Sequence, residues 1–329
     1  MRKPSVSTAS WFLLAAVWVA PASALAARRV ILISVDGLRP DAIAVADTPT
    51  LDGLIAGGAY SAFALCDLPP ATLPNHTTMV TGVYARTHGV IFNVEVEGFL
   101  DRQTIFSIAH HAGLTCGFFT NKSKLKFLAP PAFFDHRLIA DDADSMNAAV
   151  VTALAALPPD LLFVHYKDTD SAGHESGWMS DAYLEAVERI DALIGEVVDA
   201  LGDLGLLDET AILVTADHGG LGTIQAPNVP EVRYIPWIAC GAGIVHGRTL
   251  CDFIDQPDTP ATVLALLGLP VPEDFEGQVV ESALTHVPQE VCEPVAPFVG
   301  LPCVLLMGPL VMVAVLGLQA RAKQFRSTL

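Results

Sequence analysis

Five short apolar runs, separated by segments with helical patterns, constrain the fold of this 329-residue chain more than any other feature. The runs are 29–35, 115–120, 161–166, 211–215 and 235–240, and the helical segments include 50–56, 143–156, 181–201 and 259–267. Apolar strands that alternate with helices are typical of parallel sheets whose strands are joined by crossover helices. The sequence therefore predicts one α/β domain, with a mostly parallel sheet sandwiched by helices.

The segment 181–201 has the clearest helical pattern. Its apolar residues recur close to the 3.6-residue period of a helix, at Ala186, Ile190, Leu193, Ile194 and Val197. Most of its charged residues fall on the opposite face, among them Glu185, Glu188, Asp191 and Arg189. We expect a helix that lies on the sheet with its acidic side chains toward solvent.

The N-terminal residues 1–26 have the pattern of a secretory signal. Arg2 and Lys3 precede an apolar stretch at 11–20, and small residues allow cleavage after Ala24 or Ala26. An uncleaved anchor is the alternative, although the apolar stretch is short for a membrane span. The folded domain is expected at 27–286.

A second apolar segment near the C-terminus differs from the first in length and flanks. Residues 295–318 carry no charge and, as a helix, would be long enough to cross a bilayer. The basic residues Arg321, Lys323 and Arg326 follow, in a tail at 319–329. Positive charge next to a span favours the cytoplasmic side. The sequence thus predicts a linker at 287–294, one transmembrane helix and a domain exported to the periplasm or the cell exterior.

Charge and cysteine content limit the partners and the disulfides. The formal net charge is −18, with only 18 Lys and Arg residues, and nucleic-acid binding depends on clustered basic side chains. We therefore expect no nucleic-acid polymer as a partner. The six cysteines permit disulfides in an exported chain. Cys240 and Cys251 are the nearest pair outside the span, but the connectivity is not deducible from sequence.

Side chains that can bind metal ions follow three of the apolar runs. Asp36 follows the first run, Asp170 and His174 follow the third, and Asp217 and His218 follow the fourth. Ligands of open parallel sheets bind beyond the carboxyl ends of the strands. Burial of a carboxylate beside an imidazole is costly unless a ligand binds both, and both are zinc ligands. Each group alone fits an ordinary turn or loop, so the metal-site hypothesis depends on all three.

A threonine at a predicted helix start adds a nucleophile. Thr72 precedes Pro74, which favours the first turn of a helix, so Thr72 is expected at or just before the N-cap. Threonine is an ordinary capping residue, but the same position faces exposed N–H groups that attract phosphate. A neighbouring metal would make its hydroxyl a nucleophile. Asn93, further along, offers a neutral donor to a phosphoryl oxygen.

Together these residues resemble the alkaline phosphatase superfamily, and within it the type I phosphodiesterase/nucleotide pyrophosphatase branch. The similarity covers nearly everything from Arg29 to Gly277. The matching strings, in order, are Ser34-Val35-Asp36-Gly37, Thr72-Leu73-Pro74-Asn75-His76-Thr77, Thr81-Gly82, His88-Gly89 with Asn93, Asp170 with Gly173-His174, and Asp217-His218-Gly219.

The resemblance implies a two-metal phosphoester hydrolase that acts on small phosphodiester or pyrophosphate bonds. One Zn²⁺, or another divalent cation, would be held by Asp36, Thr72, Asp217 and His218, and a second by Asp170, His174 and a further histidine. Thr72 would attack phosphorus and form a phosphothreonine that water then hydrolyses. Asn93 would bind the charged equatorial oxygens.

The chain departs from this pattern at the second metal. Gln225 occupies the place where a ligand histidine is expected after the Asp-His-Gly string, and an amide oxygen is a poor zinc ligand. His246 is a candidate substitute, but an exposed loop histidine is the more ordinary reading. A member of the family that binds ligands without turnover is therefore an alternative to the enzyme.

Two lysines bear on the substrate class. Lys122 and Lys124 follow the second apolar run, and in extended backbone they would point the same way. Two cations suit a dianionic phosphate monoester, so a phosphomonoesterase is a second alternative. A solvated lysine cluster explains them equally well. Sulfatases fit less well, because they use a modified Cys or Ser where this chain has Thr72.

Overall fold

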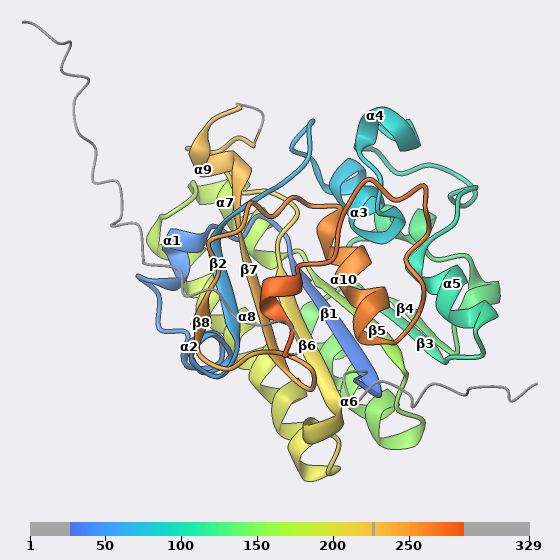
Figure 1. Cartoon of the computed structure of the whole chain (residues 1–329). Coiled ribbons are helices and arrows are strands. Elements are labelled where there is room, and N and C mark those ends of the chain that lie inside the picture. The colour runs from blue at the N-terminus through green and yellow to red at the C-terminus, as the bar shows by residue number, and fades with distance from the viewer. Residues whose placement is uncertain (1–26, 226–227, 286–329) are drawn as a thin grey trace, which may run out of the picture. The chain divides into compact units, whose positions relative to one another are not determined.

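The computed structural model describes residues 27–225 and 228–285, which form an eight-stranded sheet with helices on both faces (Figure 1). The strands are β1 Arg29–Val35, β2 Ala59–Leu65, β3 Cys116–Thr120, β4 His136–Ile139, β5 Leu161–Tyr166, β6 Thr210–Thr215, β7 Tyr234–Gly241 and β8 Arg248–Thr249. Their order in the sheet is β4-β3-β5-β1-β6-β7-β2-β8. The predicted α/β class, with a mostly parallel sheet, is confirmed.

Ten α-helices connect and cover the strands within the described residues. They are α1 Pro40–Ile43, α2 Pro49–Gly57, α3 Thr72–Thr81, α4 Ala85–His88, α5 Ile105–His111, α6 Ala143–Ala156, α7 Asp168–Ser176, α8 Asp181–Asp203, α9 Pro230–Arg233 and α10 Asp258–Leu266. Helices α2, α6 and α8 pack together on one face of the sheet, and α3, α5 and α10 pack on the other. The sheet is therefore covered on both sides, as parallel sheets require.

The three central strands, β5, β1 and β6, pair in parallel and consist entirely of buried residues. Their sequences are rich in Val, Ile and Leu, which is typical of strands that are buried on both faces. Aromatic side chains complete the core next to them, with Phe118 stacked on Phe163. These strands form a rigid base for the residues at their carboxyl ends.

Strand β7 differs from the prediction in direction. It was expected as one of the parallel strands, but it runs antiparallel to both of its neighbours, β6 and β2. A parallel neighbour needs a crossover long enough to return the chain to the starting edge of the sheet. Among the described residues between β6 and β7, the four-residue α9 is the only helix, so the chain re-enters the sheet at the same end of the strands where it left.

Helix α8 has the predicted apolar face. One of the acidic residues predicted to face solvent is an exception. Asp191 is 1% exposed, although it was expected on the solvent face. Its two carboxylate oxygens accept hydrogen bonds from the backbone N–H groups of Thr50 and Leu51, at 3.0 and 2.7 Å. Asp191 therefore caps the N-terminus of α2, where no side chain of α2 itself does so.

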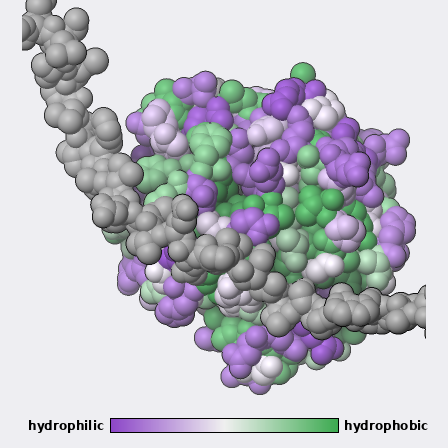
Figure 2. Space-filling view, viewed as in Figure 1, coloured by the Kyte–Doolittle hydropathy of each residue, from purple (hydrophilic) through white to green (hydrophobic). Residues whose placement is uncertain are grey.

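The surface and the ends add little to the position of the site. On the face drawn in Figure 2, hydrophilic residues cover much of the outline, and hydrophobic residues gather toward its centre.

Among the helices of residues 27–225 and 228–285, none is long and apolar enough to cross a membrane. The predicted signal at 1–26, the linker, the span at 295–318 and the tail lie outside the described residues. Cys66, Cys116 and Cys240 carry free thiols.

Candidate active site

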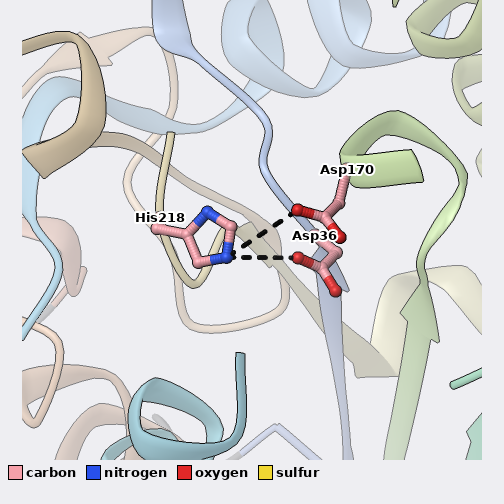
Figure 3. Close-up of side chains that lie close together, drawn as sticks. All are labelled: Asp36, Asp170 and His218. Carbon is pink, nitrogen blue, oxygen red and sulfur yellow. Dashed lines mark ion pairs between the residues drawn. The ribbon is translucent and has the colours of Figure 1, made fainter. Parts of the chain in front are cut away.

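The candidate site lies at the carboxyl ends of the three central strands. Asp36 follows β1, Asp217 and His218 follow β6, and Asp170 lies in α7, which follows β5. Because β1 lies between β5 and β6, these side chains converge at its carboxyl end, and Figure 3 shows three of them, Asp36, Asp170 and His218. Asp36, Asp217 and His218 have no exposed surface, and Asp170 is 5% exposed.

Four atoms of this group face one another. Asp36 Oδ1, Asp170 Oδ1, Asp217 Oδ2 and His218 Nε2 are buried, and within the described part of the chain none has a hydrogen-bond partner. His218 Nε2 lies 3.4 Å from Asp36 Oδ1 and 4.0 Å from Asp170 Oδ1 (Figure 3), and 3.3 Å from Asp217 Oδ2. Bare carboxylate and imidazole atoms in such a cluster are costly unless a cation binds them.

The spacing and chemistry of three of these atoms, from Asp36, Asp170 and His218, fit one divalent metal ion, since they lie within 4.8 Å of one another, and Asp217 Oδ2 lies beside His218. Zinc bonds to nitrogen and oxygen ligands are about 2.0–2.1 Å long, so the ligands of a tetrahedral site lie about 3.3 Å apart. The two shorter distances from His218 Nε2 match that value. His218 Nδ1 lies 2.9 Å from the carbonyl oxygen of Gly219 and donates to it, which turns the Nε2 lone pair toward the carboxylates.

Lys122 occupies the other side of the two shared carboxylates. Its Nζ donates to Asp36 Oδ2 at 2.5 Å, to Asp170 Oδ2 at 2.8 Å and to Thr72 Oγ1 at 3.2 Å. Thus Asp36 and Asp170 each turn one oxygen to the ammonium and the other to His218. Burial opposes the charge on Lys122, but Asp36 and Asp170 outweigh it and raise the pKa of the ammonium.

The carboxylates themselves respond unequally to burial. Burial raises the pKa of Asp217 to about 8, and the nearby Asp36 adds to the shift. Burial acts in the same direction on Asp36, but Lys122, followed by His165 and His218, lowers its pKa well below the usual range. Both carboxyl groups therefore lie in a region of negative charge. Asp36 stays ionised there, whereas Asp217 most needs a further cation to be ionised.

Thr72 lies beside the same carboxylates, at the start of α3. It is the first residue of the helix, and its side chain does not cap the helix, since the N-cap is Ala71. Thr72 is 1% exposed, and its hydroxyl oxygen lies 3.2 Å from Lys122 Nζ. The expected N-cap role is therefore wrong by one residue, and the hydroxyl faces the cluster instead.

Asn93 and Lys124 lie together at the same end of α3. Asn93 Oδ1 accepts a hydrogen bond from the backbone N–H of Leu73 at 3.0 Å and from Lys124 Nζ at 3.2 Å. The amide nitrogen of Asn93 is thus the atom left to donate to a ligand. The segment after Lys122 is a 3₁₀ helix, Ser123–Leu128, rather than extended backbone, yet both lysines reach the start of α3, Lys122 at Thr72 and Lys124 at Asn93.

His174 and Gln225 form a pair at the edge of the cluster. His174 Nε2 lies 2.7 Å from Gln225 Oε1 and 3.3 Å from Asp170 Oδ1, while Nδ1 lies 3.0 Å from the carbonyl oxygen of Thr223. Gln225 is therefore next to His174, as expected for the residue that stands in the place of a histidine ligand. His174 is 44% exposed, in contrast to the buried His218.

His246 lies away from the cluster. It follows β7, whose last residue, Gly241, pairs with Ala211 near the start of β6, whereas Asp217 follows the other end of β6. His246 is exposed and lines a cavity of about 740 Å³ together with Leu54 and Ile212. The suggestion that His246 replaces the missing ligand is wrong, because the length of the strand separates the two.

Two buried histidines were not predicted as site residues. His165 Nε2 lies 3.3 Å from Asp36 Oδ2, and His76 Nδ1 lies 3.5 Å from Asp217 Oδ2. Burial lowers the pKa of both rings, so they are neutral donors or acceptors that orient the carboxylates. The signal for His165 was its place inside an apolar strand, where a polar ring needs a partner.

Trp178 packs against residues next to the site and helps to fix their positions. Its indole packs against Gly173 and Gly220 at distances that leave no room for a Cβ atom, and its Nε1 donates to the carbonyl oxygen of Gly37 at 2.9 Å. The ring also meets His174 edge to face, with centroids 4.9 Å apart. Gly37, which has a positive φ of 72°, donates its N–H to Asp217 Oδ1 at 3.1 Å.

With the geometry established, comparison with known proteins assigns the family. Residues 30–229 match the family described as type I phosphodiesterase/nucleotide pyrophosphatase. The chain belongs to this family of hydrolases. That membership confirms the superfamily resemblance inferred from the motifs.

Individual relatives agree in sequence and in fold. Ectonucleotide pyrophosphatase/phosphodiesterase family member 3 of Rattus norvegicus is 27% identical over 214 residues, which cover 58% of this chain and 24% of that protein. Human ectonucleotide pyrophosphatase/phosphodiesterase 5 has the same fold, with a TM-score of 0.68 at 15% identity over 78% of this chain and all of the other. An inactive form of the murine protein in complex with AMP has a TM-score of 0.64 at 15% identity, over 76% of this chain and 97% of the other. The chain thus spans about a quarter of the length of the rat relative.

Proposed function

We propose that this protein is a metal-dependent phosphodiesterase or pyrophosphatase that uses Thr72 as its nucleophile. The observation that carries the proposal is the position of the Thr72 hydroxyl. It faces the carboxylates of Asp36 and Asp170 through Lys122, at the N-terminus of α3. A nucleophile, a cation-binding cluster and a helix N-terminus that favours anions are the parts that phosphoryl transfer needs.

In this proposal each residue has a defined task. Asp36, Asp170, Asp217 and His218 would hold the metal ion, which when bound supplies positive charge and lowers the pKa of a nearby hydroxyl. Thr72 gives its hydroxyl proton to solvent and attacks phosphorus with Oγ1. The bond to the leaving oxygen breaks, and that oxygen keeps the electron pair and takes a proton from water. Water then cleaves the phosphothreonine and restores the hydroxyl. Asn93 donates its amide N–H to a phosphoryl oxygen during both steps.

The contacts of Lys122 favour a diester over a monoester substrate. A monoester is a dianion and would need an uncompensated cation in the site. Lys122 already contacts two carboxylates that compensate its charge, whereas Lys124 donates to neutral oxygens of Asn93 and is the cation that a monoester would have to use. Since the structure of a murine protein with the same fold is in complex with AMP, we infer that a nucleotide diester or pyrophosphate is a suitable substrate class.

The test uses purified full-length protein in detergent, supplied with zinc. We expect hydrolysis of bis-p-nitrophenyl phosphate in preference to p-nitrophenyl phosphate. Thr72→Ala should lower kcat by roughly 10³-fold or more, because the covalent step is lost. Thr72→Ser, which keeps a hydroxyl, should retain measurable turnover. The matched control is Thr152→Ala, on the exposed side of α6, which should leave the rate unchanged.

Each alternative predicts a different result. Preference for the monoester would replace the diesterase proposal with the monoesterase. A protein that binds zinc but hydrolyses neither ester would indicate a binding member of the family, which Gln225 makes the specific alternative.

We also propose that the domain is exported and held at a membrane by residues 295–318. The support is the pattern of residues 1–26, the uncharged segment and its basic flank. Fractionation of cells that express the whole chain should leave it in the membrane fraction after alkaline carbonate washing. A chain that ends at residue 286 should appear in the soluble exported fraction, and retention of this shorter chain in the membrane would contradict the anchor.

A further inference from the structure

The site contains two positions for positive charge, and they differ in what fills them. The first lies among unpartnered atoms of Asp36, Asp170 and His218, with the unpartnered Asp217 Oδ2 beside His218. The second is filled by the chain itself, since Lys122 Nζ donates to Asp36 Oδ2, Asp170 Oδ2 and Thr72 Oγ1. Three donated hydrogen bonds are all that an ammonium group can make. Lys122 is therefore fully used in this position, with 14% of its side chain exposed.

The charges balance with a single divalent ion. The cluster contains three carboxylates, those of Asp36, Asp170 and Asp217, and Lys122 already compensates one of them. One divalent ion at the unpartnered atoms would compensate the other two. A second ion would leave an excess of positive charge in a buried site, where uncompensated charge is costly.

The ligands that remain for a second ion are weak. Asp170 Oδ2 is engaged by Lys122, and Asp170 Oδ1 lies 3.3 Å from His174 Nε2 and 4.0 Å from His218 Nε2, so both positions share it. The other candidates are His174 and Gln225, which lie 2.7 Å apart. One shared carboxylate oxygen, one imidazole and one amide oxygen are a weak set for zinc. The residues of this chain therefore do not fit the second metal that the family resemblance implied.

We infer that this protein holds one divalent metal ion, and that the ammonium of Lys122 takes the place of the second. The inference rests on the proposed function for the role of the site, but not for the number of ions. In this arrangement Lys122 is a catalytic residue, because its ammonium contacts the Thr72 oxygen and stabilises the negative charge that develops there. Gln225 is consistent with this inference, because without a second ion no histidine ligand is needed at position 225.

The test is the zinc content of the purified full-length protein. Each variant is incubated with excess zinc chloride, dialysed against metal-free buffer and measured by inductively coupled plasma mass spectrometry. We expect one zinc per chain for the wild type. Gln225→His alone should also hold one, because Lys122 still engages Asp170. The double variant Lys122→Ala with Gln225→His should hold two. Lys126→Ala, which removes an exposed lysine paired with Glu95, is the matched control and should hold one.

Every other result overturns the inference in a distinguishable way. Two zinc ions in the wild type, or in Gln225→His alone, would show that Lys122 excludes nothing, and the proposed hydrolase would stand. A double variant that still holds one ion would show that Lys122 does not occupy a metal position. No zinc in the wild type would overturn both this inference and the proposed function. Circular dichroism checks folding, and Lys122→Met, which keeps the side-chain length, replaces Lys122→Ala if that variant unfolds.

Discussion

The packing of Trp178 against glycine gives a prediction that can be worked out from distances. An added Cβ at Gly220 would lie 2.1 Å from Trp178 Cδ2 and 2.2 Å from Cε2. Ordinary carbon contacts are about 3.5–4.0 Å, so the indole would have to move by more than an ångström. Gly220 has no positive φ, so the cost of Gly220→Ala is steric rather than a cost of backbone conformation.

The magnitude follows from two effects. Overpacking of a buried site costs about 1–3 kcal/mol. Movement of the indole also breaks the hydrogen bond from Trp178 Nε1 to Gly37, which contributes about 0.5–1.5 kcal/mol. We therefore expect Gly220→Ala to lower the free energy of unfolding by about 2–4 kcal/mol. Gly53→Ala is the matched control. A Cβ there, within α2, meets no atom within 4 Å, so it should stabilise the protein by about 0.5–1 kcal/mol.

The assay is equilibrium unfolding in urea, followed by far-ultraviolet circular dichroism. A double-mutant cycle with Trp178→Ala isolates the contact, because removal of the indole should abolish most of the cost of Gly220→Ala. The reasoning is refuted if Gly220→Ala is as well tolerated as Gly53→Ala. It is also refuted if the cost of Gly220→Ala remains the same without the indole.

Three further predictions concern other parts of the fold. Asp191→Ala should lower the free energy of unfolding by about 2–3 kcal/mol, since two N–H groups at the start of α2 lose a charged acceptor. Asp191→Asn should lower it less, and an equal loss for both variants in urea unfolding would contradict the capping role. Burial lowers the pKa of His88 from 6.5 to about 4, so the folded state binds fewer protons than the unfolded state between these values. Stability should therefore fall as the pH falls through this window, and His88→Gln should flatten the dependence of the melting temperature on pH; an unchanged slope would exclude His88 as its source. Burial raises the pKa of the Cys66 and Cys116 thiols to about 12, so neither should react with a thiol reagent at pH 8 until urea unfolds the chain, and rapid labelling of either in the native protein would contradict this.

The central strands were predictable because their physical situation is simple. Strands β1 and β5 have the predicted bounds, since runs of Val, Ile and Leu buried on both faces contrast sharply with their flanks. The outer strands were missed for the opposite reason. Ala59–Leu65 is made largely of small residues, and His136–Ile139 has four half-buried residues at a sheet edge. The direction of β7 depends on the shape of the preceding connection, which hydrophobic periodicity does not report.

The position of a site residue was predictable where the end of a strand determines it. It was not predictable where the conformation of a long side chain determines it. Asp36, Asp217 and His218 converge because strands β1 and β6 are neighbours, and Asp170 joins them from the end of β5. The grouping of Asp170 with His218 rather than with His174 alone depends on rotamers, which the sequence does not determine. The destination of Lys122 depends on a 3₁₀ turn and on a flexible side chain that reaches across the site.

The burial of β5, β1 and β6 on both faces has a consequence for how the protein fails. Asp36 and the Asp217–His218 pair are carried by adjacent strands joined by a continuous ladder of backbone hydrogen bonds. To move them apart, the backbone hydrogen bonds between β1 and β6 must break at the centre of the sheet. This requires opening of the whole domain rather than a local fluctuation. If the site holds the proposed metal ion, a chelator should therefore remove it while amide protons in these strands continue to exchange slowly. Inactivation by metal loss would then be reversible on re-addition, whereas thermal inactivation would destroy the ligand set itself.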